Sequence, residues 1–201
     1  MSQSPENGRI IGIDPGSLHT GYGVLACRGA ELKLLAYGVV SPKEDWPLAL
    51  RLAHIHRAIM DLMAEHQPSA MALEEVFTFK NPRSAIKLAQ ARGVSVLAAG
   101  LSNVPVYEYS PTLVKSVVAG SGRADKKQVA YMVAQIFDLR GPIGADASDA
   151  LAIAVCHAGQ SNSVLTAKGL AAASHNRASS WRNLSLTDLE ALGYKVEKNQ
   201  R

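Results

Sequence analysis

The chain has 201 residues, of which 47% are hydrophobic and 19% are charged, a balance typical of a globular domain and not of a disordered chain. It contains no run of 18 apolar residues and starts with the polar segment MSQSPENGR, so the sequence predicts neither a membrane span nor a signal peptide. The net charge of +4 is unevenly spread: residues 80–127 carry 8 Lys and Arg against 2 Asp and Glu, which suits either a polyanionic partner or a solvated helix face.

The first three elements after a leader at 1–8 are predicted to be strands. The apolar run Ile10-Ile11-Gly12-Ile13 ends at Asp14, and segments 21–28 and 31–40 follow after short turns, so we expect antiparallel neighbours. Apolar spacing then predicts strands and helices that alternate along the rest of the chain: a helix at 47–66, a strand at 69–73, a helix at 82–101, a strand at 104–109, and helices at 111–119, 124–139 and 146–158.

This order predicts an α/β fold with a five-stranded mixed sheet, antiparallel in its first three strands and parallel afterwards, flanked by helices. We expect one domain over 9–159. Beyond it, Ser, Ala and Asn accumulate, and 160–201 is expected to be a basic tail that is ordered in part at most. The two cysteines, Cys27 and Cys156, lack metal-ligand spacing and indicate reduced thiols in a cytoplasmic protein.

Asp14 stands at the end of a buried strand and admits two interpretations. Its carboxylate can accept hydrogen bonds within the Pro15-Gly16 turn that follows, as Asp often does in turns. Alternatively it belongs to a site, because a carboxylate at such a position is costly to bury unless it is paired or binds a metal. Other acids that converge on Asp14 would favour the second interpretation.

Two more acidic positions resemble Asp14 in context. Glu74 and Glu75 follow the apolar strand AMAL, and alternation lets only one of them point toward the same crevice. Asp146 and Asp149 are three residues apart and therefore share one face of a helix, although Asp146 is also a natural N-cap. Carboxylates select hard divalent cations such as Mg²⁺, and two such ions can support phosphodiester hydrolysis.

Five segments resemble, in unbroken order over 9–158, the motifs of the RuvC family of Holliday-junction resolvases, the crossover junction endodeoxyribonucleases: GIDPGSLHTGYGV, ALEEVFTFKN, SAIKLAQARGV, VKSVVAGSGRADKKQV and DASDALAIA. The resemblance implies an RNase H-like fold and a homodimer that makes symmetric paired nicks in four-way junction DNA, leaving 5′-phosphates, in homologous recombination and DNA repair. It implies two Mg²⁺ per subunit, which Mn²⁺ can replace. It implies that the catalytic and metal-binding residues are Asp14, Glu74, Asp146 and Asp149, and so chooses Glu74 over Glu75.

The same resemblance implies DNA contacts outside the acids. Phe77 matches an aromatic that meets an unpaired base at the junction centre, and Lys115 and Lys126 match basic positions near the scissile phosphates. Lys127 is the alternative to Lys126, because the alignment permits either. Arg83 and Lys87 are expected to contact the DNA backbone. Helix 82–101 is expected to pack on the partner subunit, and a RuvA–RuvB branch-migration complex is expected as a further partner.

Other functions share parts of this pattern. An ATP-binding protein of the actin-like superfamily also has an apolar strand followed by GID and a Gly-rich turn, but it needs a second such loop and a second lobe. A junction-binding module without catalysis is a further alternative, although four retained acids argue against it. RNase H-like nucleases that act on RNA form the last alternative, since a fold does not specify its substrate.

Overall fold

A computed structural model describes residues 8–29, 31–75 and 82–161 of the chain. Phe77 and residues 162–201 lie outside these ranges, so the predictions made for them stay predictions.

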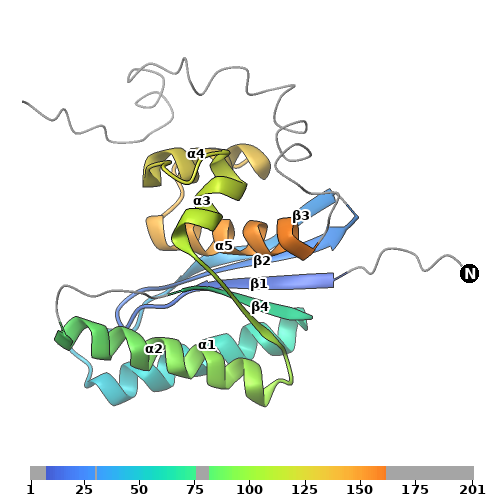
Figure 1. Ribbon diagram of the computed structural model, residues 1–201. Helices are drawn as coiled ribbons and strands as arrows, with labels where there is room; N and C mark the ends of the chain where they lie inside the picture. The colour runs from blue at the N-terminus through green and yellow to red at the C-terminus, as the bar shows by residue number, and fades with distance from the viewer. Residues whose placement is uncertain (1–7, 30, 76–81, 162–201) are drawn as a thin grey trace, which may run out of the picture.

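The described residues form a mixed sheet with helices on both faces (Figure 1). Strands and helices follow one another in the order β1 (Gly8–Asp14), β2 (Thr20–Arg28), β3 (Glu31–Val40), α1 (Leu48–His66), β4 (Ala70–Glu74), α2 (Pro82–Leu101), β5 (Val106–Tyr109), α3 (Pro111–Ala119), α4 (Lys126–Ile136) and α5 (Ala145–Ser161). The strand order is β3-β2-β1-β4-β5, in which β1 pairs antiparallel with β2 and parallel with β4. This confirms the five-stranded mixed sheet. Within these residues, no helix is long and apolar enough to cross a membrane.

Helix α4 is shorter than the predicted helix over 124–139, at both ends. It starts after Asp125, whose side chain accepts a hydrogen bond from the Gln128 amide at 2.8 Å, while the Gln128 side chain accepts one from the Asp125 amide at 2.9 Å. This reciprocal capping box sets the first turn. The helix ends before Asp138, whose φ of 51° is left-handed and incompatible with helix continuation.

The two faces of the sheet bury different residues of the same strand. Ile10 of β1 packs in the core beneath α3, α4 and α5, whereas Ile11 and Ile13 pack in the core beneath α1 and α2. Figure 1 shows these helix groups on opposite sides of the sheet. Because successive side chains of a strand alternate between faces, Asp14 points to the same side as Ile10, the side of α5.

Helix α5 lies directly against backbone, because glycines replace side chains on the face of the sheet beneath it. A Cβ added at Gly12 would lie 2.8 Å from the Ala154 amide nitrogen and would also meet the Ala150 carbonyl. A Cβ at Gly21 would meet the Asp146 carbonyl, and one at Gly23 would meet Leu151. These three glycines form the seat of α5, which no residue with a side chain can supply at this distance.

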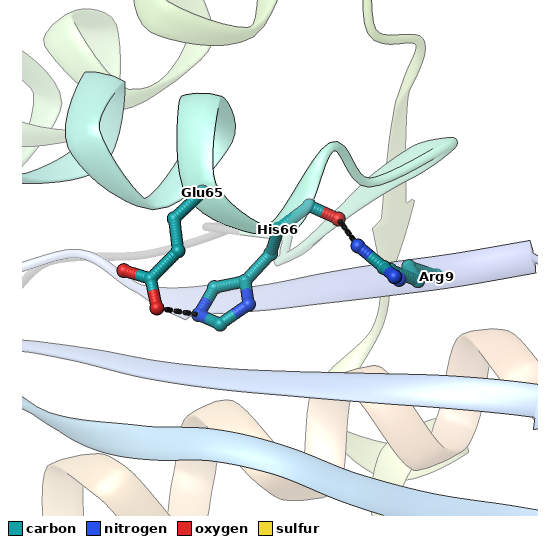
Figure 2. Close-up of polar contacts among 3 residues, drawn as sticks. All are labelled: Arg9, Glu65 and His66. Carbon is teal, nitrogen blue, oxygen red and sulfur yellow. Dashed lines mark hydrogen bonds and ion pairs between the residues drawn. The ribbon is translucent and has the colours of Figure 1, made fainter.

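Arg9, near the start of β1, contacts the C-terminal end of α1. The Arg9 guanidinium donates a hydrogen bond of 2.8 Å to the His66 carbonyl, and Glu65 lies 3.8 Å from the His66 ring (Figure 2). Arg9 also accepts hydrogen bonds at its own carbonyl from Ser69, through the backbone amide at 2.8 Å and the hydroxyl at 3.0 Å. These contacts hold the start of β1 against the end of α1 and the residue before β4. Strand β4 therefore enters the sheet beside β1.

The seat of α5 makes a specific prediction about stability. Gly12→Ala forces a methyl group against helix backbone and is expected to lower the free energy of unfolding by about 1–3 kcal/mol. Gly93→Ala is the control, because Gly93 lies inside α2 with open space around it and a helical alanine stabilises by roughly 0.5–1 kcal/mol. Urea denaturation measures both, and equal effects of the two substitutions would contradict the close packing.

Candidate active site

Asp14 ends β1, and its carboxylate takes no part in closing the turn that follows. Thr20 closes that turn instead: its hydroxyl donates to the Gly16 carbonyl at 2.7 Å and accepts from the Gly16 amide at 3.3 Å. Across the described ranges no hydrogen bond to the Asp14 carboxylate forms. The turn-capping interpretation of Asp14 is therefore not supported.

Glu74 occupies the same place on the parallel neighbour of β1. Ile13 pairs with Leu73, one residue before each acid, so Asp14 and Glu74 end adjacent strands at one edge. Leu73 packs beneath α1 and α2 and Ala72 beneath α5, so by alternation Glu74 points toward α5 and Glu75 points away. The packing of β4 thus puts Glu74, and not Glu75, on the side of the sheet that α5 covers.

The first turn of α5 brings two more acids to this edge. The Ser148 amide donates to the Gly144 carbonyl at 2.9 Å, which places Asp146 inside the helix and not at its N-cap. The backbone of Asp146 lies on Gly21, the residue that pairs with Asp14 across β1 and β2. Asp149, one turn further, accepts a hydrogen bond of 2.7 Å from the Lys126 ammonium.

The four acids lie close enough to act on one another electrostatically. Burial, together with repulsion from Asp149, Glu74 and Asp146, raises the pKa of Asp14 to about 7, although Lys126 opposes the shift. Burial and the Asp149 charge also raise the pKa of Glu74, and Lys126 and Lys115 oppose that shift. Like charges held this close disfavour ionisation of the group among them. The fold therefore concentrates negative charge that nearby lysines neutralise only in part.

The donor chemistry of this cluster fits a hard divalent cation. All four side chains offer carboxylate oxygens, which Mg²⁺ and Mn²⁺ prefer, and three of them accept no hydrogen bond from described residues. As they stand, however, no three or more His, Cys, Asp or Glu side chains among the described residues are placed to hold a metal ion. The acids therefore suit a cation by chemistry and charge, and binding would require their side chains to change rotamer.

The structure divides the predicted DNA-contact residues into two groups. Lys115 and Lys126 lie near the acids, as their effects on Glu74 show. Lys127 is exposed on the first turn of α4. Arg83 and Lys87 are exposed at the start of α2, on the opposite face of the sheet from α5 (Figure 1). Of the five basic residues predicted to contact DNA, Lys115 and Lys126 are thus the two that lie beside the acids.

A partly buried pair that sequence analysis missed links β5 to α5. Tyr109 of β5 pairs with Glu74 in the parallel register, and its hydroxyl lies 2.6 Å from His157 Nδ1 on α5. The same imidazole lies 3.2 Å from the Ser161 hydroxyl through Nε2. This contact ties the helix that carries Asp146 and Asp149 to the strand beside Glu74. No local pattern in the sequence pairs a tyrosine and a histidine 48 residues apart.

Comparisons with known proteins agree on one family. The family model for crossover junction endodeoxyribonuclease RuvC matches residues 10–157. The chain is 46% identical over 150 residues to such an enzyme of Azorhizobium caulinodans, covering 75% of this chain and 89% of the relative. It is 45% identical over 162 residues to that of Vibrio cholerae, covering 81% and 93%. The structure of T. thermophilus RuvC in complex with a Holliday junction substrate matches with a TM-score of 0.74 and 37% identity, covering 79% and 98%.

The raised pKa of Asp14 predicts how stability depends on pH without divalent cations. A carboxyl with a pKa of about 7 in the folded protein, against 3.8 unfolded, destabilises the fold when it ionises. This penalty is absent below about pH 4, grows as the pH rises, and is complete above about pH 7. Asp14→Asn is therefore expected to raise the free energy of unfolding at pH 8 by on the order of 1–3 kcal/mol, after allowance for solvent screening.

Thermal melts in EDTA at pH 8 and pH 4.5 measure this effect. The melting temperature of Asp14→Asn should exceed that of the natural protein at pH 8, and the difference should shrink at pH 4.5. Asp61→Asn is the matched control, because Asp61 is exposed on α1, the helix on the far face of the sheet. A lower melting temperature for Asp14→Asn at pH 8 would contradict the electrostatic account.

Proposed function

This chain belongs to the RuvC family of crossover junction endodeoxyribonucleases, and from that premise we propose that Asp14, Glu74, Asp146 and Asp149 form its catalytic centre. Its RNase H-like fold is that of the family. In this proposal the centre hydrolyses phosphodiesters at a four-way DNA junction, with symmetric nicks that leave 5′-phosphates, in recombination and repair. Family membership does not support the actin-like ATP-binding alternative.

One observation carries the assignment of the site. Asp14 is held among three other carboxylates, accepts no hydrogen bond from described residues, and has its pKa raised to about 7. Such an arrangement costs folding free energy, and strongly perturbed acids of this kind cluster at functional sites. The three elements that meet here, β1, β4 and α5, are otherwise well packed. Ionisation of the acids is therefore what lowers the free energy of unfolding at this end of the sheet.

Mg²⁺ is the proposed cofactor, at two ions per subunit, with Mn²⁺ as a substitute. The four carboxylates would hold the ions, with Asp14 central because it lies between Glu74 on β4 and the acids of α5. Bound divalent cations in such sites activate a water for attack and stabilise charge on the leaving oxygen. The protein's own part is to hold these carboxylates together, through the strand ends and the first turn of α5, although this raises the pKa values of Asp14 and Glu74.

The basic residues are proposed to position the DNA. Lys115 and Lys126 supply positive charge beside the acids, where a scissile phosphate would otherwise be repelled. Arg83, Lys87 and Lys127 are proposed to contact backbone phosphates further out, which would make junction affinity fall steeply with salt. Phe77 is proposed to stack on an unpaired base at the junction centre, so that Phe77→Ala loses cleavage more than junction binding.

The proposal includes a homodimer, because two symmetric nicks need two catalytic centres. Helix α2 supplies an apolar surface for a second copy: Ile86, Leu97 and Leu101 are 60%, 52% and 60% exposed on it. Large exposed apolar side chains grouped on one helix are typical of an interface. Sedimentation of the purified chain measures this directly. The RuvA–RuvB partner complex and the cytoplasmic location stay predictions.

A synthetic mobile four-way junction tests the catalytic proposal. With Mg²⁺ the purified chain should make paired nicks at symmetric positions, and the products should be ligatable. Asp14→Asn should reduce the rate by about 100-fold or more while it still binds the junction, because a group that stabilises developing charge is removed. Asp61→Asn should cleave normally.

The same assay separates the alternatives. Absence of cleavage by the natural chain over several junction sequences, with Mn²⁺ as well as Mg²⁺, would leave only a binding module. Faster cleavage of an RNA substrate than of the DNA junction would favour the RNA-acting alternative. Normal cleavage by Asp14→Asn would contradict the assigned centre.

A further inference from the structure

The Lys126–Asp149 contact is the one direct ion pair that any of the four acids makes within the described residues. The Lys126 ammonium lies 2.7 Å from Asp149 Oδ2, a short charge-assisted hydrogen bond. Asp149 is the more enclosed partner, with 25% of its side chain exposed, whereas 79% of the Lys126 side chain is exposed. The long, exposed side chain of Lys126 thus reaches from solvent to the more enclosed carboxylate of Asp149.

The backbone of Lys126 is fixed although its side chain is exposed. Lys126 is the first residue of α4, directly after the Asp125–Gln128 capping box, and Val129 and Val133 anchor this helix in the core against α5. A lysine stem on a fixed backbone keeps its ammonium within reach of Asp149. The same stem has many rotamers, so the ammonium can leave the carboxylate without movement of the helix.

The charge of Lys126 acts on the acid cluster beyond Asp149. It lowers the pKa values of Asp14 and Glu74, against the burial and the acid charges that raise them. The hydrogen bond with Asp149 raises the pKa of Lys126 itself, so the ammonium stays charged at neutral pH. Lys126 is therefore a built-in counterion for the acid cluster.

We propose that Lys126 competes with divalent cations for the acid cluster and thereby raises the cation concentration needed to load it. Its ammonium occupies Oδ2 of Asp149, a carboxylate that is proposed to hold a cation, and the ammonium and the cation would repel each other. The inference rests on the proposed function, because it takes Asp149 as a metal ligand. Loading of the site then requires Lys126 to withdraw from Asp149, which leaves its charge available for a DNA phosphate.

Mn²⁺ binding to the full chain without DNA tests this inference, by titration with the EPR signal of free Mn²⁺ as the readout. Lys126→Met removes the charge and keeps the stem, and it should bind Mn²⁺ with a Kd lower by roughly three- to tenfold, as expected for loss of one partly exposed charge contact. Lys126→Arg keeps the charge and should stay near the natural value. Lys127→Met is the matched control: it removes the same charge from the neighbouring exposed residue and should change Kd by less than about twofold.

Each outcome bears on the competition. Mn²⁺ binding that appears only in Lys126→Met supports it, as does the predicted drop in Kd. Unchanged or weaker binding in Lys126→Met overturns it, as do equal effects of Lys126→Met and Lys127→Met, or no binding by any of these proteins. Asp14→Asn and Asp149→Asn in the same titration separate this from the proposed function. If they lose Mn²⁺ binding while Lys126→Met gains nothing, only the competition fails; if they bind Mn²⁺ and cleave junctions normally, the catalytic centre itself is wrong.

Discussion

Helix α5 lies on the bare backbone of β1 and β2, and the acid cluster depends on that contact. With Gly12, Gly21 and Gly23 beneath it, the helix approaches until the Asp146 backbone lies on the residue that pairs with Asp14. A side chain at Gly21 would push on the first turn of α5, and one at Gly12 or Gly23 on the turns that follow, so each would move Asp146 and Asp149 away from the strand ends. Small residues in the sheet thus determine a distance between acids that are far apart in sequence.

The same packing places unfavourable charge next to a favourable core. Ala150, Leu151 and Ala154 are fully buried just beyond the acids, and this burial stabilises the helix that carries them. Burial of the Asp14 carboxyl and repulsion among the carboxylates oppose it, and together they raise the pKa of Asp14. Cores of this kind can hold a strained polar site because the strain is small beside the total burial. Lys126 relieves part of the repulsion, which gives an α4 residue influence over the chemistry of α5.

Sequence reasoning predicted most of the fold because its signals are local. Apolar runs bounded by Gly and Pro predicted the strands, and helical spacing predicted the helices. The errors lie at helix ends, where capping decides, as at Asp125 and Asp138 on either side of α4. The positions of the acids at the ends of apolar segments were also predictable, and their catalytic role stays a proposal. Contacts between distant segments were not: the glycine seat, the Tyr109–His157 pair and the Lys126–Asp149 ion pair arise only when helices and strands pack. The direction of Glu74 needed the register of β4, which alternation alone does not give.

The central claim is that carboxylates from β1, β4 and α5 bind divalent cations at one point on the sheet edge. Anomalous scattering from Mn²⁺ in crystals of the chain tests this most directly, because it locates the ion without reference to activity. The account predicts peaks bonded to Asp14 together with Glu74 and at least one of Asp146 and Asp149. Mn²⁺ bound elsewhere, with none of these side chains as ligands, would contradict it.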